Sequence, residues 1–151
     1  MSLRDYQNAI DDFSKVIELD PHNKNAYYRR GNAKCHLENY KGSIADYSKV
    51  IDLDTHNKDA YFIRGFTYLK LMDFHSEYFN KIAIDDFSKV IELDTEFEEA
   101  YFYRGSAKYA LQDYQGAIDD YSKLIELDPE FEEAYFYRGD AKMSLRDYQN
   151  A

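Results

Sequence analysis

The chain has 151 residues, of which 44% are hydrophobic and 17% aromatic, and this aromatic content excludes a disordered chain. With 6 glycines and 2 prolines it has too few turn residues for a many-stranded sheet, so the composition favours an all-helical domain. The formal net charge of −10 argues against nucleic acid and anionic membranes as partners and favours a basic or neutral protein.

Two sequence patterns recur along the chain and set out its predicted elements. The first pattern reads AYYR, AYFI, AYFY and AYFY, beginning at Ala26, Ala60, Ala100 and Ala134. The second pattern, AIDDFSKVIELD in its first copy, begins at Ala9, Ser43, Ala83 and Ala117. Both patterns return after 34, 40 and 34 residues, which indicates a 34-residue period with six extra residues near 75–80.

Each period predicts two helices, because apolar residues recur at helical spacing. The second helix of one period, for example, carries the stripe Tyr40, Ile44, Tyr47 and Ile51. We expect residues 1–21 to be the second helix of an incomplete unit, 22–55 a unit, 56–95 a unit with the insertion, 96–129 a unit, and 130–151 the first helix of an incomplete unit.

Polar residues and prolines predict where these helices begin and end. The side chains expected to cap second helices are Asp5, Asn39, Asp73, Asp113 and Asp147. Pro21 and Pro129 cannot continue a helix, whereas Thr55 and Thr95 occupy the same place in the other linkers and give weaker stop signals.

Small residues recur where two helices must approach closely. The first helices contain Gly31, Gly65, Gly105 and Gly139. A glycine inside a helix costs about 0.5–1 kcal/mol relative to alanine, so its return in every period indicates close packing.

These features resemble the tetratricopeptide repeat family over essentially the whole chain. The shared features are the period, an aromatic residue four positions before the glycine, a small residue twelve positions after it, an aromatic residue sixteen after it, and the L-D-P ending. The resemblance implies an all-α fold, an α-solenoid in which antiparallel helical hairpins stack as a right-handed superhelix. It also implies a protein-interaction scaffold rather than an enzyme.

One departure from the family pattern is regular. Where the family often has leucine, this sequence has Arg30, Arg64, Arg104 and Arg138, and lysine replaces a preferred aromatic at Lys34, Lys108 and Lys142. We expect the arginines of the complete units to pair with Asp46, Asp86 and Asp120 across the hairpin. The alternative is a solvated arginine.

The resemblance implies that the first helices line a concave groove for an extended peptide or a partner helix. The residues expected on the groove are Tyr28, Asn32, Asp59, Phe62, Phe66, Glu99, Phe102, Ser106, Tyr109, Glu133, Phe136 and Asp140. Aromatic side chains interleaved with acids predict a peptide with apolar anchors and basic residues. The alternative is that Phe62, Phe102 and Phe136 fill gaps between hairpins.

Other kinds of site receive little support. A subset of the family binds C-terminal carboxylates of heat-shock chaperones through a cationic clamp, and Asn32 matches one clamp residue. The other clamp positions, without the required cations, are Tyr28, Ile63, Glu99 and Tyr103. Adjacent Cys35 and His36 point in different directions on a helix, and no metal-ligand spacing appears. We expect no catalytic residue, metal or cofactor.

The two ends of the sequence predict a second mode of interaction. Residues 1–9 and 143–151 are identical, and each lies in an incomplete unit. The residues expected to lack a partner and to support self-association are Ile10, Phe13, Ile17, Tyr135, Leu145 and Tyr148. A head-to-tail homo-oligomer is therefore the alternative function; the other interpretation is a longer array cut at frayed ends.

Two smaller expectations complete the sequence reading. The insertion near 75–80 either lengthens both helices of its hairpin, raising a knob with Phe74, Tyr78 and Phe79, or forms a longer loop. Cys35 is the only cysteine and no apolar run reaches the roughly 18 residues of a membrane span, so we expect a cytoplasmic protein.

Overall fold

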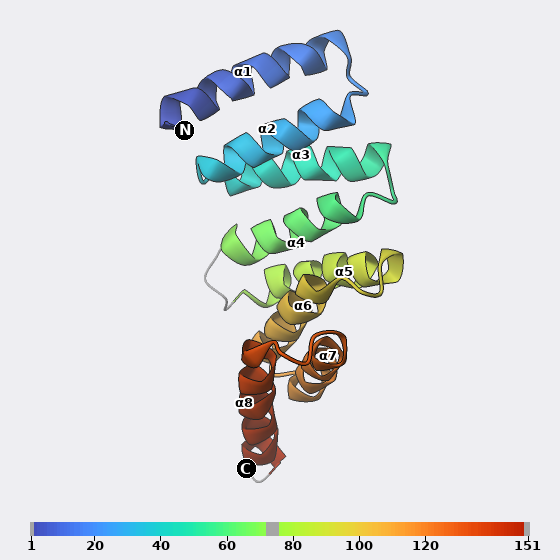
Figure 1. Cartoon of the computed structure of the whole chain (residues 1–151). Helices are drawn as coiled ribbons and strands as arrows, with labels where there is room; N and C mark the ends of the chain where they lie inside the picture. The colour runs from blue at the N-terminus through green and yellow to red at the C-terminus, as the bar shows by residue number, and fades with distance from the viewer. Residues whose placement is uncertain (1, 72–75, 150–151) are drawn as a thin grey trace.

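The computed structural model describes residues 2–71 and 76–149, and these residues form eight α-helices and no strand (Figure 1). The helices are α1 (Leu3–Leu19), α2 (Lys24–His36), α3 (Tyr40–Leu53), α4 (Lys58–Leu71), α5 (Glu77–Leu93), α6 (Glu98–Ala110), α7 (Tyr114–Leu127) and α8 (Glu132–Gln149).

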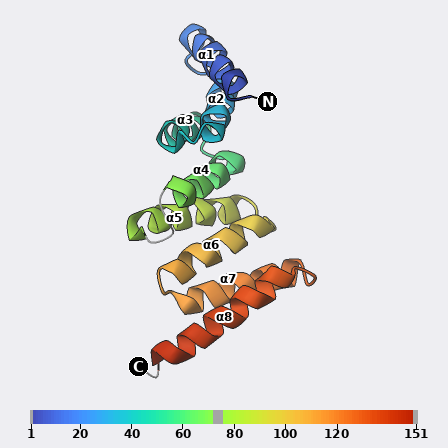
Figure 2. The same cartoon turned by 90° about the vertical axis from the view of Figure 1, so that its left-hand side faces the viewer.

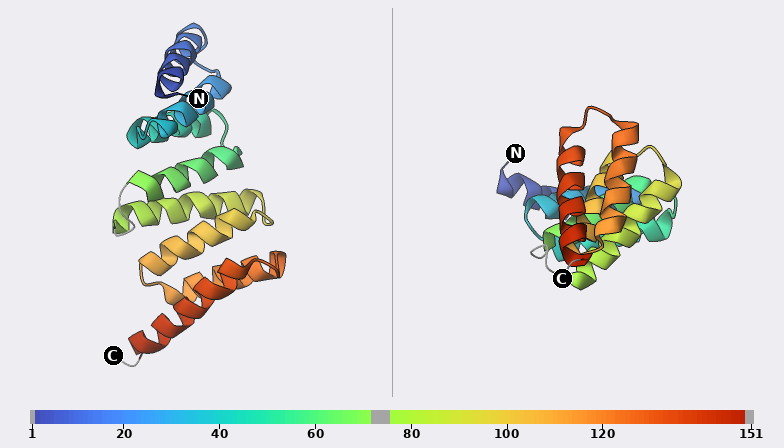
Figure 3. Two further views of the ribbon diagram at one scale, coloured as in Figure 1. Left: turned by 60° about the vertical axis from the view of Figure 1, so that its left-hand side comes forward. Right: turned by 90° about the horizontal axis from the view of Figure 1, so that it is seen from below.

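The helices stack in the order of the sequence. The extensive contacts join each helix to its neighbours in the chain, and α4 also touches α6. Figures 1 and 2 show a single row from α1 to α8 with the termini at opposite ends, and the view along the row in Figure 3 shows the hairpins turned relative to one another. The expected right-handed α-solenoid of antiparallel hairpins is confirmed for the described residues.

The turns within two complete hairpins share one geometry. Asn39 Oδ1 and Asp113 Oδ1 each accept the backbone N–H three residues on, at 3.1 and 2.9 Å, as predicted. The residue before each cap, Glu38 or Gln112, has a positive φ of 58° or 62°. A single residue in the left-handed region therefore reverses the chain at each turn.

The capping prediction is partly confirmed at Asp5, whose carboxylate accepts the Ser2 N–H at 2.7 Å, and is wrong at Asp147. Ser2 is the N-cap of α1 and forms a capping box with Asp5, which therefore lies in the first turn. Asp147 lies inside α8, which passes through the turn position as a continuous helix. No following helix packs on α8 within residues 2–71 and 76–149, so a turn would lose helical hydrogen bonds without gaining contacts. Asp73 lies outside the described residues.

An aspartate, rather than a proline, marks the end of each second helix. The C-caps of α1, α3, α5 and α7 are Asp20, Asp54, Asp94 and Asp128. Each carboxylate accepts the backbone N–H two residues on, at 3.0 to 3.2 Å. The helices end at the same position whether proline or threonine follows, since the aspartate cap is common to all four.

The recurring glycines bring the two helices of each hairpin into contact. A Cβ atom at Gly31 would lie 2.7 Å from Tyr47 Cε1, and one at Gly105 would lie 2.9 Å from Tyr121 Cε1. Both tyrosines are fully buried. The predicted close packing is confirmed in these hairpins, whereas Gly139 on α8 has open space in place of a ring.

The predicted arginine–aspartate pairs are confirmed in all three complete units. The Nε and Nη2 groups of Arg30, Arg64 and Arg104 donate to both carboxylate oxygens of Asp46, Asp86 and Asp120 at 2.6 to 2.9 Å. The Nη1 group of each arginine donates to a serine of the preceding second helix at 3.0 to 3.1 Å. Each guanidinium therefore ties together three successive helices, and the aspartate side chains are only 4% exposed.

Two lysines add a second cation to these aspartates. Lys34 and Lys108 lie 2.7 and 2.9 Å from the aspartate of their unit. Among the described residues, Asp86 of the middle unit pairs with Arg64 alone, because Tyr68 stands at the lysine position. Burial raises the pKa of Asp86 above its usual range, in spite of the hydrogen bonds from Arg64.

The described part of the insertion lengthens mainly α5. This helix has 17 residues where α3 and α7 have 14, whereas α4 has 14 residues where α2 and α6 have 13. Tyr78 is 68% exposed, and Phe79 is half-buried and stacks on Tyr68 with 5.8 Å between ring centroids. Phe74 lies outside the described residues. Within residues 2–71 and 76–149, the two helices are therefore not lengthened equally.

The terminal helices cover part of the faces that were expected to lack a partner. Ile10, Phe13 and Ile17 are half-buried, since α1 packs on α2. Leu145 is half-buried against an apolar cluster of α7 and α8. Leu145, which was expected to be exposed, is thus partly covered, and the role of these four residues in self-association stays a prediction. By contrast, Tyr135 is 44% exposed and Tyr148 is 69% exposed.

Candidate interaction groove

Three cavities lie along the first helices of the units. The largest, about 350 Å³, is lined by Tyr28, Asn32, Cys35, His36, Tyr40, Tyr47, Ile63, Phe66 and Lys70. A neighbouring cavity of about 190 Å³ is lined by Lys24, Asn25, Tyr28, Val50, Asn57 and Asp59. The third, about 180 Å³, is lined by Glu98, Glu99, Phe102, Tyr103, Leu124 and Phe131, and we call it the Glu98 cavity.

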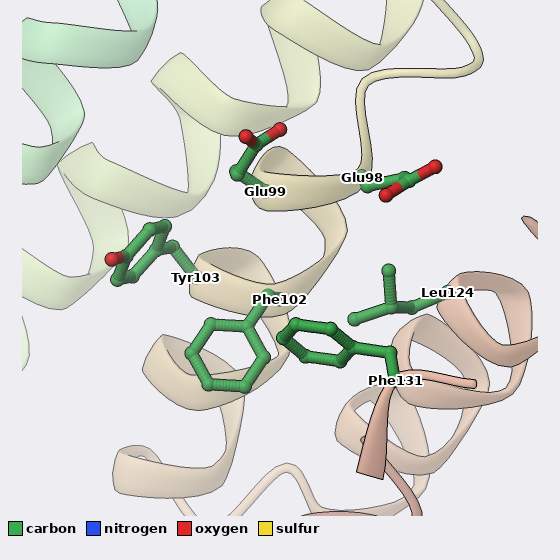
Figure 4. Close-up of a pocket in the computed structure, with 6 residues that line it drawn as sticks. All are labelled: Glu98, Glu99, Phe102, Tyr103, Leu124 and Phe131. Atoms are coloured by element: carbon green, nitrogen blue, oxygen red, sulfur yellow. The ribbon is translucent and has the colours of Figure 1, made fainter. Parts of the chain in front are cut away.

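The Glu98 cavity combines an apolar floor with an acidic rim. Figure 4 shows Glu98 and Glu99 at the start of α6, with the rings of Phe102 and Phe131 below them and Leu124 alongside. The two rings meet edge to face with 5.6 Å between centroids. Leu124 is buried, whereas both glutamates are exposed. A side chain with an apolar stem and a cationic end would match this arrangement.

The charge at Glu98 reverses a pattern seen in the two preceding junctions. Lys24 and Lys58 hold the equivalent position at the start of α2 and α4. Each ammonium group pairs with the aspartate that ends the next second helix, so each junction joins the start of a first helix to the end of the second helix after it. Lys24 Nζ lies 2.6 Å from Asp54 Oδ2, and Lys58 Nζ lies 2.5 Å from Asp94 Oδ2. Hydrogen bonds from these lysines lower the pKa of both aspartates. At the third junction that aspartate is Asp128. No described cation pairs with Asp128 or with Glu98, so the negative charge of this junction is not neutralised.

The two cavities of the N-terminal half carry cations as well as an acid. Lys24 and Asp59 line the smaller cavity, and Lys70 lines the larger one. The ammonium group of Lys70 lies 5.0 Å from the ring centroid of Phe66, which is a cation–π distance. The charge around these cavities therefore changes from mixed along α2 and α4 to negative at the start of α6.

Half of the predicted groove residues line these cavities. They are Tyr28, Asn32, Asp59, Phe66, Glu99 and Phe102. Phe62 instead packs among the rings of four other aromatic residues at 5.0 to 6.4 Å between centroids. It fills the space between hairpins, as the alternative interpretation proposed. Phe102 both lines a cavity and contacts Tyr121 and Tyr137 of the stack.

The other predicted groove residues lie outside these three cavities. Ser106 Oγ lies 3.2 Å from Tyr121 Oη, and Tyr109 Oη lies 3.0 Å from Ser144 Oγ, so both hydroxyls bond within the stack. Burial raises the pKa of Tyr121 to about 12, and its phenol stays protonated at neutral pH. On α8, Glu133 and Phe136 are exposed and Asp140 is half-buried.

Sequence reasoning missed four residues of the Glu98 cavity. Glu98 carried an available signal, since it breaks the lysine series of Lys24 and Lys58. Leu124 and Phe131 come from a second helix and the following linker, whereas the groove prediction involved first helices alone. Tyr103 was considered only as a position of the carboxylate clamp.

The structure shows little of the carboxylate clamp or of other sites. The Oδ1 atom of Asn32 accepts a hydrogen bond from the Tyr47 hydroxyl at 2.8 Å, and Ile63 lines the same cavity without a charge. Within the described ranges, no group of three or more candidate metal ligands gathers. No helix there combines the length and apolar character needed to cross a membrane.

The fold defines a helical-repeat scaffold of the kind that supports protein–protein interaction. A family model described as tetratricopeptide repeat matches residues 1–65, and another described as TPR repeat matches residues 105–145. The chain belongs to the tetratricopeptide repeat family.

Solved structures of the same fold match most of the chain. A MamA protein is 28% identical, with a TM-score of 0.85 over 95% of this chain and 76% of that one. The first TPR of Spaghetti (RPAP3), bound to the HSP90 peptide SRMEEVD, is 26% identical, with a TM-score of 0.73 over 82% of this chain and 93% of that one. YrrB, at 23% identity and a TM-score of 0.83 over 95% and 71% of the two chains, supports the fold alone. None of the curated proteins matches this sequence.

Proposed function

We propose that this protein is an interaction scaffold whose groove binds an extended peptide with apolar anchors and a basic residue. The Glu98 cavity is the observation that carries the proposal. Its floor of Phe102, Leu124 and Phe131 accepts an apolar stem, and its rim of Glu98 and Glu99 accepts a cation. The proposal includes a cytoplasmic location and no catalytic role.

The charge of the third junction supports the choice of a basic peptide. In the other junctions a lysine of the protein neutralises the aspartate at the helix end. A lysine or arginine of the peptide would supply the corresponding cation between Glu98 and Asp128. The net charge of −10 also favours the approach of a basic segment over an acidic one.

The solved structure of RPAP3 with its peptide supports peptide binding in general, with a different peptide chemistry. The peptide in that structure, SRMEEVD, carries three acidic side chains. The corresponding expectation for this chain is a basic peptide, because Glu99 occupies a clamp position where a cation would be required. The two proteins would then share the binding face and differ in the charge that they select.

A charge reversal that the fold already tolerates tests the proposal. Glu98→Lys introduces the side chain found at Lys24 and Lys58, so it is expected to preserve folding and to neutralise Asp128. Glu126→Lys makes the same charge change at an exposed position of α7 outside the cavities and is the matched control. Peptides are selected from a random ten-residue library, and their affinities are then measured by fluorescence anisotropy.

We expect the selected peptides to combine apolar and basic residues and to bind Glu98→Lys at least about tenfold more weakly, with less than about a twofold change for Glu126→Lys. Selection of acidic peptides, or equal weakening by the two variants, would contradict the proposed function.

A further inference from the structure

Two of the three cavities occupy the same place in different units. Five lining residues of the smaller N-terminal cavity hold the repeat positions of five lining residues of the Glu98 cavity: Lys24, Asn25, Tyr28, Val50 and Asn57 correspond to Glu98, Glu99, Phe102, Leu124 and Phe131. The N-terminal cavity therefore contains a lysine of the chain itself, whereas no lysine or arginine lines the Glu98 cavity.

The junction of α4 and α5 shows how an ammonium group is held at such a place. Lys58 Nζ lies 2.5 Å from Asp94 Oδ2 and 5.5 Å from the centroid of the Phe97 ring, which is a cation–π distance. Asp94 Oδ1 is already bonded, since it accepts the Glu96 N–H at 3.1 Å. One carboxylate oxygen and one ring therefore contact the lysine. We call the aspartate that ends a second helix, together with the phenylalanine of the following linker, the ammonium site.

The third junction has the ammonium site without the lysine. Asp128 and Phe131 hold the positions of Asp94 and Phe97. Asp128 Oδ1 accepts the Glu130 N–H at 3.0 Å, and no side chain of the described ranges donates to Asp128 Oδ2. Because the chain has a glutamate at the lysine position, a cation for this site must come from a partner.

The linker has the same backbone conformation at both junctions. The Phe97 and Phe131 N–H groups each donate to the carbonyl of the aspartate that ends the preceding helix, at 3.3 Å. The carbonyl of each phenylalanine accepts the N–H three residues on, at 3.1 Å. Asp94 and Asp128 are both extended C-cap residues. The backbone therefore places the carboxylate of Asp128 and the ring of Phe131 as it does at the lysine-containing junction.

A single available oxygen favours an ammonium group over a guanidinium group. The arginines of the hairpins, such as Arg104, donate from Nε and Nη2 to both oxygens of an aspartate. The lysines of the junctions instead donate to Oδ2 of an aspartate whose Oδ1 binds a backbone N–H. Asp128 is of the second kind. An ammonium group is a compact charge that needs no second oxygen, whereas a guanidinium group binds best as a fork.

We propose that the Glu98 cavity is selective for a lysine of the bound peptide, whose ammonium group lies between Asp128 Oδ2 and the Phe131 ring. This inference rests on the proposed function and specifies its basic residue. The stem of the lysine packs on Phe102 and Leu124 at the floor of the cavity (Figure 4). The exposed carboxylates at the rim attract either cation, so Asp128 and Phe131 determine the preference for lysine.

The position of the cavity in the fold supports a peptide as the source of the lysine. Residues of α6, α7 and the linker before α8 line the cavity, and described helices lie on both sides of it. The rim is exposed, so a side chain of a peptide lying along the first helices reaches it. Acetylation of that lysine removes its charge and would release the peptide.

Two substitutions remove the two parts of the ammonium site. Asp128→Asn removes the charge and keeps an oxygen that accepts the Glu130 N–H, so the helix end stays capped. Phe131→Leu removes the ring and keeps an apolar side chain. The matched controls are Asp20→Asn, at an aspartate that ends α1 in the same way, and Phe79→Leu, at a ring outside the cavity. Circular dichroism verifies that each variant is helical.

The affinities of one peptide in three forms measure the preference. A peptide selected from the library is synthesised with lysine, arginine or acetyllysine at its basic position, and binding is followed by fluorescence anisotropy. We expect the lysine form to bind at least about fivefold more tightly than the arginine form and at least about tenfold more tightly than the acetyllysine form. In Asp128→Asn and Phe131→Leu the preference for lysine over arginine should fall below about twofold, whereas both controls should keep it.

The results separate this inference from the function on which it rests. Equal binding of the lysine and arginine forms, or a preference that persists in both Asp128→Asn and Phe131→Leu, would overturn the inference while basic peptides still bind. Selection of peptides without a basic residue would instead contradict the proposed function, and the lysine site with it.

Discussion

Alanine in place of Gly31 or Gly139 makes the same change in a filled and in an open environment. Alanine is favoured over glycine inside a helix by about 1 kcal/mol at both positions. At Gly31 the new Cβ would lie 2.7 Å from Tyr47 Cε1, and the ring is fully buried and bonded through its hydroxyl to Asn32. Overpacking of this kind costs about 1–3 kcal/mol.

Helix propensity and overpacking together predict opposite outcomes at Gly31 and Gly139. Gly31→Ala should lower the free energy of unfolding by up to about 2 kcal/mol, whereas Gly139→Ala should raise the stability of α8 by about 0.5–1 kcal/mol. Urea unfolding followed by far-ultraviolet circular dichroism measures both effects, with the protein dilute enough to be monomeric. For a denaturant dependence of about 1–3 kcal/mol per molar, the midpoints should differ by about 1 M.

Repeat arrays unfold through nearest-neighbour units, so the whole unfolding curves are compared rather than a single midpoint. Equal stabilisation by the two alanines would refute the reasoning, because it would mean that the Tyr47 ring moves aside without cost and that the glycine is not needed for close packing.

Three further outcomes follow from the buried pairs and the helix caps. Arg64→Ala leaves Asp86 buried without a cation and should lower the free energy of unfolding by about 3–5 kcal/mol. Arg138→Ala leaves no buried carboxylate without a partner and should lower it by less than about 1 kcal/mol. Equal losses in the two variants would contradict the role of the arginine–aspartate pair. In Arg64→Ala the pKa of Asp86, already raised by burial, rises further, so the folded state holds the proton more tightly than the unfolded chain. The variant therefore loses the most stability at a pH above the pKa of Asp86 in the folded state. The loss shrinks as the pH falls toward the pKa of an aspartate in the unfolded chain, about 3.9, so unfolding curves at about pH 7 and about pH 4.5 should differ. A loss of stability that does not depend on pH would argue against this account. Asp113→Ala removes a helix cap and should lower the stability by about 1 kcal/mol, whereas Asp147→Ala, inside α8, should change it by less than about 0.5 kcal/mol. Thermal unfolding of the two variants measures this difference. A similar loss at both positions would indicate that the chain forms a turn at Asp147.

The repeated pattern was sufficient to predict the hairpins and their buried ion pairs. Gly31 and Asp46 recur at constant offsets in each unit, and a contact made by constant offsets must recur with them. The same reasoning failed at Asp147, where the local sequence is that of a turn but no later helix of the described residues packs on α8. Helix capping there depended on packing rather than on sequence.

The sequence by itself determined the helical period, the all-α solenoid and the arginine–aspartate pairs, because each is a relation between residues at constant spacing within one unit or between adjacent units. Only the tertiary structure decided that Phe62 is packed while Phe102 lines a cavity, and that Glu98 faces Phe131 of the next linker. It also decided that Gly139 and Asp12 lie open at opposite ends of the stack. These properties depend on side chains from several helices meeting in space, and a linear pattern shared by every unit does not distinguish the unit that is covered from the one that is not.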